Sequence, residues 1–363
     1  MEENDNKGKK RKGGNMETIA FYISDQGLVH ITRCLILIEE MVQTTTNNIY
    51  IACGESQNRF AKRYIDKYLS KYSNRVTYNN IKTDIGLIKQ KNSLSVDVPK
   101  LENELKKYAN ELPRLVDNEI EKLRYKNPVF IISDISILGI LVAEKLNIKK
   151  IGISNFTWYT HYKKLNIDKQ ILQIFYDAYN KLDCFLAYDL TLDISHLKCD
   201  IEKIGLISRK IDYKSVNEIK KHNWPSVYVG NELSPKLKQT NIHFDKNVRQ
   251  LSINILDTQN HVAASELVII KASWETLAEA LISKTPIVVI EGATEDEPII
   301  NILKEQNLCL TIKQQELYNL DILDLQIKLQ KLKTSKYEND IEKTVNKICG
   351  YIEESEDVLC CIS

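Results

Sequence analysis

Glycine is scarce in this chain, and two signals that depend on it are absent. Only 12 of the 363 residues are glycine, and neither a complete G-x-G-x-x-G turn nor a Walker-type phosphate loop occurs. These absences argue against a dinucleotide-dependent dehydrogenase and against a kinase domain. Loops that hold phosphate usually need glycine so that the backbone can approach the ligand closely. Any anion site in this chain would therefore be built with few glycines.

A large net charge, a long apolar run and a cysteine ligand pattern are also missing. Fifty Lys and Arg stand against 49 Asp and Glu, so no overall field favours nucleic acid or an acidic membrane as a partner. No apolar run approaches eighteen residues and no signal-peptide pattern is present, which predicts a cytoplasmic location. Eight scattered cysteines without a CxxC pair are typical of reduced thiols, and they predict no metal site.

Both ends of the chain are unusual. Residues 1–15 contain the basic stretch KGKKRKGG, which we expect to be a disordered arm. The last four residues, CCIS, match a C-a-a-X prenylation box in which Cys360 would carry the lipid, although acidic residues precede it. Association with a membrane is therefore expected only if this tail is prenylated.

Apolar runs of strand length alternate with amphipathic stretches of helix length along most of the chain. This repetition predicts parallel sheets covered by helices on both faces. A long charged helix near the middle of the first half is expected to be interrupted at Pro113. The expected strands lie at residues 18–24, 47–54, 128–134 and 149–156, and then at 224–232, 246–254, 267–270, 285–292 and 307–312.

The length of the chain suits two domains of ordinary size. Two parallel sheets joined near the middle would place a cleft between the carboxyl ends of their strands, where ligands bind in such folds. The expected division is an N-terminal domain over 16–207, a linker over 208–223, a C-terminal domain over 224–350 and a tail over 351–363.

The sequence SDQGLVHITR, residues 24–33, joins the first expected strand to the first expected helix. Backbone N–H groups at a helix start, together with the helix dipole, favour an anion or a polar sugar group. His30 would lie in the first turn, where it can act as a base near neutral pH. A histidine at the surface end of a helix, with no function, fits the same pattern.

A second strand–turn–helix unit occupies residues 267–290. Thr276 can cap the helix, and Glu279 lies one turn further on, where its carboxylate can accept two hydroxyls of a ribose. The helical periodicity fits equally well with a Glu279 side chain that is exposed to solvent and binds nothing. Three acids, Glu295, Asp296 and Glu297, precede a proline at the next helix start, where acids complement the helix dipole without any ligand.

These segments together resemble the GT-B glycosyltransferases that use nucleotide sugars. The likeness is to the branch with a GHGFGHATR motif, which is related to the N-terminal glycosyltransferase-like part of plant arabinokinases and to the peptidoglycan N-acetylglucosaminyltransferases. Gly27, His30, Thr32 and Arg33 match that motif. Three further stretches agree with the family in order and spacing, through Ser133, Asp134, Asn155, Phe156 and Trp158, then Gly205 and Arg209, then Lys271, Thr276, Glu279, Ala280, Pro286, Glu297 and Pro298.

The resemblance implies an α/β protein in which two Rossmann-like domains face each other across a cleft. It implies sugar transfer from a nucleotide-sugar donor, with UDP as the first choice, to an acceptor hydroxyl of unknown identity. His30 would be the base, and no metal or cofactor would be needed, because loop N–H groups and a helix dipole carry the diphosphate charge. The implied donor residues are Gly27, Gly230, Lys271, Ser273, Thr276, Glu279, Glu295, Asp296 and Glu297, and the acceptor residues are Asp134, Asn155 and Trp158.

The chain departs from this family at its glycine-rich turns, which here carry Asp25, Val29, Ser273 and Glu275. A carboxylate in a diphosphate turn would repel the donor. Two hypotheses therefore stand, an active glycosyltransferase and a catalytically silent module that binds a sugar nucleotide or a protein. An epimerase would need a second base near His30, for which the sequence offers no strong candidate. The other histidines are expected to be structural or on the surface.

Overall fold

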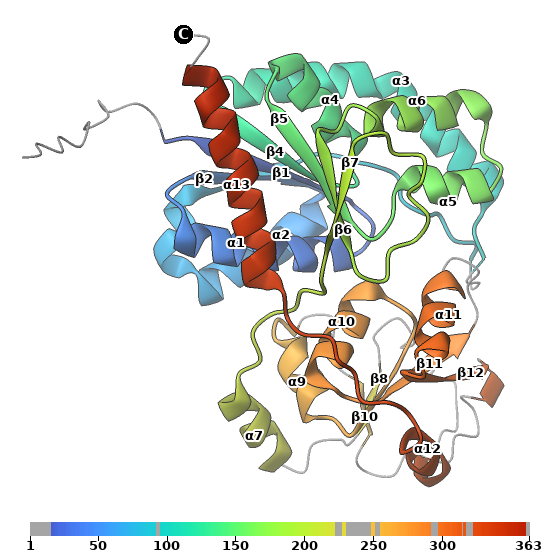
Figure 1. Ribbon diagram of the computed structural model, residues 1–363. Coiled ribbons are helices and arrows are strands. Elements are labelled where there is room, and N and C mark those ends of the chain that lie inside the picture. The colour runs from blue at the N-terminus through green and yellow to red at the C-terminus, as the bar shows by residue number, and fades with distance from the viewer. Residues whose placement is uncertain are drawn as a thin grey trace, which may run out of the picture.

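The computed structural model contains two parallel β-sheets, one in each domain, and both are flanked by helices (Figure 1). This arrangement confirms the predicted α/β class. The residues that the structure describes are 16–91, 95–221, 227–229, 248–250, 255–291, 297–313, 315–316 and 322–360.

The first sheet has seven strands, and all of its neighbouring pairs run parallel. These strands are β1 (Thr18–Ile23), β2 (Asn48–Cys53), β3 (Val76–Asn80), β4 (Pro128–Asp134), β5 (Lys149–Ser154), β6 (Cys184–Tyr188) and β7 (Asp200–Ile204). Their order across the sheet is β3-β2-β1-β4-β5-β6-β7. The order reverses between β1 and β4, and ligands bind at such a point in open parallel sheets.

Helices cover both faces of this sheet. On β1, Ile19, Phe21 and Ile23 pack on one face and Ala20 and Tyr22 on the other, so the whole strand is buried. A strand that is buried on both faces needs a continuous apolar run, which is why the sequence pattern found it. The first face is covered by α1 (Val29–Thr44), α2 (Glu55–Tyr68) and α13 (Ile341–Cys360), and the second by α3 (Val98–Leu123), α4 (Ile137–Leu146), α5 (Trp158–Lys164) and α6 (Lys169–Tyr179).

The predicted interruption at Pro113 is wrong, because α3 continues through it. A proline inside a helix removes one backbone hydrogen bond and would ordinarily bend or break the helix. Here a buried stripe extends on both sides of Pro113, from Leu101 to Leu112 and on to Leu123. Packing of this stripe against the sheet holds the two halves in one helix.

The second sheet has five strands in the order β12-β11-β10-β8-β9. One face packs against α9 (Thr258–Ala264), α10 (Trp274–Ser283) and α11 (Glu297–Glu305), and the other against α12 (Ile322–Leu329). The short strand expected near residue 250 is confirmed as β9. The strands are β8 (Val227–Val229), β9 (Val248–Gln250), β10 (Leu267–Ile270), β11 (Ile287–Glu291) and β12 (Cys309–Lys313).

The chain crosses between the domains twice. After β7 it reaches α7 (Tyr213–Lys221), which lies inside the stretch expected to be a linker and packs against α9. The last helix, α13, returns to the first domain and lies along α1 (Figure 1). Val345 and Ile348 of α13 belong to the buried cluster under α1, and the helix extends to Cys360, well into the stretch expected to be a tail.

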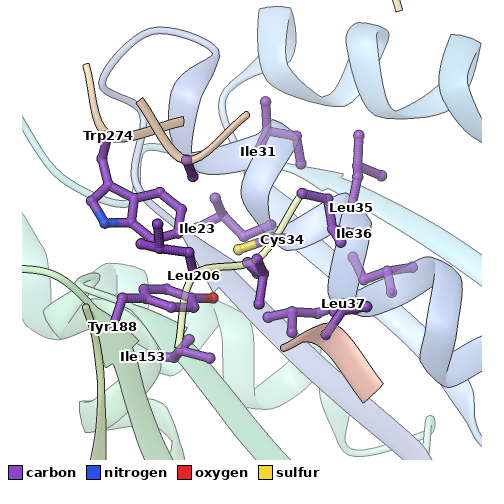
Figure 2. Packing of buried hydrophobic residues seen from close by; sticks show 14 of the residues in the cluster. Ile23, Ile31, Cys34, Leu35, Ile36, Leu37, Ile153, Tyr188, Leu206 and Trp274 are labelled. Carbon is purple, nitrogen blue, oxygen red and sulfur yellow. The ribbon is translucent and has the colours of Figure 1, made fainter. Parts of the chain in front are cut away.

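A single apolar cluster runs through both domains. Trp274, at the start of α10, packs on Tyr188 of the first domain with 4.6 Å between ring centroids, and Figure 2 shows the two rings together. The indole Nε1–H also donates a hydrogen bond to the Asp189 carbonyl at 2.9 Å. This contact fixes the start of α10 against the first domain, and the cleft described next lies beside it.

Candidate active site

A cleft of about 510 Å³ lies between the two domains. The first domain contributes the β1–α1 loop and the segments after β3, β5 and β6. The second domain contributes the turn after β10 and the first turn of α10. Its lining includes Gly27, His30, Asn155, Trp158, Lys271, Ser273 and Thr276 from the predicted site, together with Arg33, Phe60, Lys89, Phe156, His161, Leu192, Arg209, Thr258 and Glu275.

His30 and Asp134 form a pair at the point where the strand order of the first sheet reverses. His30 lies in the first turn of α1 and lines the cleft, whereas Asp134 is the last residue of β4 and lies buried behind it. The Nδ1 atom of His30 is 3.1 Å from an oxygen of Asp134. If Nδ1–H donates to this carboxylate, Nε2 is left as a proton acceptor.

Arg33 keeps the Asp134 carboxylate ionised. Its Nη2 atom is 2.5 Å from the Asp134 carboxylate and also donates to Ser154 Oγ at 3.1 Å. Burial alone would raise the pKa of Asp134, but the Arg33 guanidinium and the His30 ring lower it to about 2. Nη2 of Arg33 is also 2.9 Å from His30 Nδ1. Because Nη2 already has two oxygen acceptors, we assign the Nδ1 proton to the hydrogen bond with Asp134.

The acceptor-side residues also belong to this network. Asn155 Oδ1 accepts a hydrogen bond from Arg33 Nη1 at 3.0 Å, which fixes the segment after β5. Trp158 lines the cleft, and its indole Nε1–H donates to Asp84 at 2.8 Å. Asp134, which the resemblance places on the acceptor side, does not line the cleft. It contacts the site through His30.

Asp25, which replaces a family glycine, holds three loops together. Its carboxylate accepts hydrogen bonds from the backbone N–H groups of Gly54 and Thr83, which follow β2 and β3. Its own N–H donates to Asp84 at 3.2 Å. Gly27, by contrast, has a φ of +64°, a conformation that favours glycine. The β1–α1 loop thus keeps glycine where the backbone requires it and uses a side chain elsewhere.

We expect Asp84 to make the protein less stable as the pH rises from 4 to 6. Burial, together with the charge of Asp25, raises the pKa of Asp84 to about 6. An unfolded aspartate titrates near 3.9, so between these values the folded state binds more protons than the unfolded state. Two units of pKa correspond to about 3 kcal/mol in the free energy of unfolding.

Urea unfolding of the wild type and of Asp84→Asn at pH 4, 5, 6 and 7 measures this effect. The difference between their free energies of unfolding should change by about 3 kcal/mol in favour of the variant as the pH rises. Taking the difference cancels the carboxylates that do not interact with Asp84. Parallel pH profiles for the two proteins would contradict the assignment.

The second domain presents the start of α10 to the cleft. Ser273 is the N-cap residue of α10, and its side chain makes no capping hydrogen bond to the helix backbone. The first N–H groups of a helix have no partner within the helix, so this turn offers hydrogen-bond donors to an anion. Lys271 and Thr276 line the same part of the cleft, and Glu275 does as well.

Glu279, the expected ribose ligand, lies behind the wall of the cleft. It is 3% exposed, and its carboxylate accepts hydrogen bonds from Arg209 Nη2 at 2.6 Å and from Thr258 Oγ1 at 3.0 Å. Arg209 and Thr258 themselves line the cleft. Burial would lower the pKa of Arg209, but Glu279 and Glu275 raise it, so this arginine stays charged.

Of the remaining expected donor residues the structure describes Glu297, which does not line the cleft. Glu297 begins α11 with an exposed side chain, and only Ile299 of that helix lines the cleft. Gly230, Glu295 and Asp296 lie outside the described residues, as do the three residues after Cys360. In the part of the chain that the structure describes, no helix is long and apolar enough to cross a membrane, and no three potential ligands gather as a metal site.

A scan against protein-family models and a search of curated proteins found no match to this chain. Solved structures do match over nearly the whole length. The calicheamicin glycosyltransferase CalG4 is 13% identical, with a TM-score of 0.58, over 94% of this chain and 95% of that one. The fold is GT-B.

Two further GT-B structures cover the chain equally well. An anthocyanidin 3-O-glucosyltransferase solved with UDP is 10% identical, with a TM-score of 0.58, over 94% of this chain and 99% of that one. Arabidopsis thaliana UGT89C1, solved with UDP-L-rhamnose, is 12% identical, with a TM-score of 0.57, over 94% of this chain and 100% of that one. The expected GT-B architecture is therefore confirmed. The narrower resemblance to the GHGFGHATR branch stays a prediction from the motifs.

Proposed function

We propose that this chain is a glycosyltransferase that moves a sugar from a nucleotide-sugar donor, with UDP as the nucleotide, to an acceptor hydroxyl. The observation that carries the proposal is the His30–Asp134 pair, which lies at the wall of a cleft that also contains the first turn of α10. A base and a set of anion-binding N–H groups thus border one space. GT-B structures with UDP and with UDP-L-rhamnose support the choice of nucleotide.

In this proposal His30 takes the proton of the acceptor hydroxyl on Nε2. The acceptor oxygen attacks the anomeric carbon of the donor sugar, the bond from that carbon to the diphosphate oxygen breaks, and the nucleoside diphosphate leaves with the electron pair. Asp134 accepts the Nδ1–H hydrogen bond and stabilises the positive ring that forms. Because Asp134 is held ionised by Arg33, it is ready for this role at neutral pH.

The donor is assigned to the second domain. Lys271 and the first-turn N–H groups of α10 carry the charge of the leaving diphosphate. Arg209 and Thr258, which donate hydrogen bonds to the buried Glu279 carboxylate and line the cleft, are the nearest groups of that network to a donor ribose. Glu279 would contact the ribose directly only if one of these side chains moves.

The alternative is a silent GT-B module that binds a sugar nucleotide or a protein partner without transfer. The observation in its favour is Glu275, an acid that lines the cleft within the turn proposed for the diphosphate. Its charge opposes a second anion, and Arg209 at 3.6 Å only partly offsets it. Retention of the His30–Asp134 pair favours the enzyme.

A thermal-shift series with UDP, GDP, TDP and their common sugars tests the proposal. A ligand present at one hundred times its dissociation constant stabilises the folded state by about 2.7 kcal/mol, which corresponds to several degrees in Tm. We expect UDP and at least one UDP-sugar to produce this shift. A shift without transfer to any acceptor would identify the silent module, and no shift with any nucleotide would reject donor binding altogether.

A further inference from the structure

The side chain of Trp274 connects the donor side of the cleft to the residues behind the proposed base. Trp274 is the first residue of α10 and lines the cleft. The Cζ atom of Arg33, on α1 of the first domain, lies over the Trp274 ring at 5.3 Å from its centroid. A guanidinium this close to an aromatic face makes a cation–π contact. In the proposed mechanism the backbone at the start of α10 binds the diphosphate, whereas the Trp274 side chain has no role.

The Arg33 guanidinium is held at its edges by the first domain and at its faces by aromatic rings. Nε and Nη2 donate hydrogen bonds to the two oxygens of Asp134 at 3.3 and 2.5 Å, and Nη1 donates to Asn155 at 3.0 Å. Such hydrogen bonds lie in the plane of the group and leave its faces for stacking. The two rings come from different domains, Tyr188 at 5.2 Å and Trp274 at 5.3 Å. The second domain thus helps to position Arg33.

Trp274 is itself fixed to the first domain. Its Nε1–H donates to the Asp189 carbonyl at 2.9 Å, and its ring packs on Tyr188 with 4.6 Å between centroids. Trp274 is 4% exposed and Arg33 is 1% exposed. A movement of the second domain that withdraws the indole would therefore open the guanidinium to water. Water weakens a charged pair, so the Asp134 carboxylate would be held less firmly.

We propose that Trp274 is a positioning residue that makes the orientation of His30 depend on the contact between α10 and the first domain. It acts through Arg33, which holds Asp134, and through Asp134, which accepts the hydrogen bond of His30. The base is then held in place when the helix start assigned to the donor diphosphate is also in place. The inference rests on the proposed function for the roles of His30 and of α10. The orientation of His30 is measurable without any transfer.

The test uses three variants of the full-length protein. Trp274→Leu keeps an apolar side chain without an aromatic face, and Trp274→Phe keeps an aromatic face without the indole N–H. Leu281→Ala is the matched control, because Leu281 is buried in the same helix and does not line the cleft. All three variants are expected to lose stability, so urea unfolding at pH 7 first defines the conditions in which each of them is folded.

The first readout is the Nδ1 proton of His30, observed by NMR after labelling with 15N-histidine and assigned by its absence in His30→Ala. A hydrogen bond to the buried Asp134 carboxylate slows the exchange of this proton with water. We expect exchange to be about tenfold faster in Trp274→Leu, the effect of losing one cation–π contact to a desolvated cation. Trp274→Phe should recover most of the protection, and Leu281→Ala should match the wild type. Equal exchange in the wild type and Trp274→Leu would overturn the inference, as would an unprotected proton in the wild type.

The second readout is the division of the effect between kcat and donor binding. In Trp274→Leu we expect kcat to fall about tenfold, because the base is less well oriented. The dissociation constant of UDP, measured by calorimetry, should stay as in the wild type, because the backbone N–H groups of α10 remain. Trp274→Phe should restore most of kcat. A weaker affinity for UDP with an unchanged kcat would mean that the indole only supports the donor site, and the inference would be wrong.

The two readouts also separate this inference from the proposed function. A His30 proton whose protection depends on Trp274, in a protein that binds no nucleotide and transfers no sugar, defeats the transferase proposal and leaves the positioning role standing. Normal UDP binding and transfer, with the same proton exchange and the same kcat in Trp274→Leu as in the wild type, defeat the positioning role and leave the transferase proposal standing.

Discussion

Replacing His30 by alanine is expected to lower the rate of sugar transfer by about two to four orders of magnitude, the usual contribution of a general base. The acceptor hydroxyl then has no group to take its proton, while the donor-binding groups of the second domain are untouched. The UDP thermal shift should therefore stay as in the wild type. Transfer is measured as glycoside formed on an acceptor that the wild type uses, with release of free sugar from the donor as a second readout.

Two further measurements define the role of His30. Exogenous imidazole should restore part of the transfer activity of His30→Ala, because the lost side chain leaves space beside the cleft for a free base. His261→Ala is the matched control, since His261 lies on α9 and does not line the cleft, and it should transfer at the wild-type rate. Loss of the UDP shift in His30→Ala would instead place this residue in donor binding.

Several of the strands that the sequence predicted are buried on both faces, although the buried strand β6 was not predicted. The strands β1, β4 and β11 are continuous apolar runs because helices cover both sides of each sheet. The strands that it missed at the sheet edges, β3 and β7, carry polar and exposed residues. Pairing with a single neighbour, and not a sequence pattern, makes these segments strands, so periodicity could not find them.

The packing of the last helix could not be predicted from the sequence pattern either. The sequence pattern after residue 314 predicts helices but not the surfaces that they cover. In the structure α13 crosses back to the first domain, where Lys347 and Tyr351 contact Glu202 on the edge strand β7. Sequence adjacency assigned this segment to the C-terminal domain, whereas its buried residues pack under α1.

At the site, the sequence predicted residues on the loops that line the cleft, but not the buried contacts that hold these loops in place. His30 and Asp134 are 104 residues apart, and only the parallel pairing of β1 with β4 brings them together. Arg209 matches a family motif, but it lay in a stretch expected to be a linker, so its burial against Glu279 was not predicted. Asp25 was understood as a lost glycine, although its carboxylate ties three loops.

Asp134→Ala is expected to destabilise this protein strongly at neutral pH. Arg33 is 1% exposed, and removal of its carboxylate partner leaves a buried charge without a counter-ion. Breaking a buried ion pair in this way costs about 3–5 kcal/mol, a large part of the total stability of a typical protein. Urea unfolding at pH 7 measures the loss, and a decrease below about 1 kcal/mol would contradict it.

The pH dependence of this loss has a defined sign. Asp134 titrates near 2 in the folded protein and near 3.9 when unfolded, so its ion pair stabilises the protein fully above about pH 4. As the pH falls from 4 to 2 the carboxylate becomes protonated in both states, and this stabilisation disappears. The difference between the wild type and Asp134→Ala should therefore shrink over that interval.

A double variant separates the structural role of Asp134 from its role in transfer. Arg33→Met together with Asp134→Ala removes both charges, so no uncompensated ion remains, and much of the lost stability should return. Transfer should not return, because His30 Nδ1–H then has no carboxylate to orient the ring and to stabilise its protonated form. Recovery of transfer along with stability would mean that Asp134 serves only to neutralise Arg33. His30 would then act as a base without a carboxylate partner.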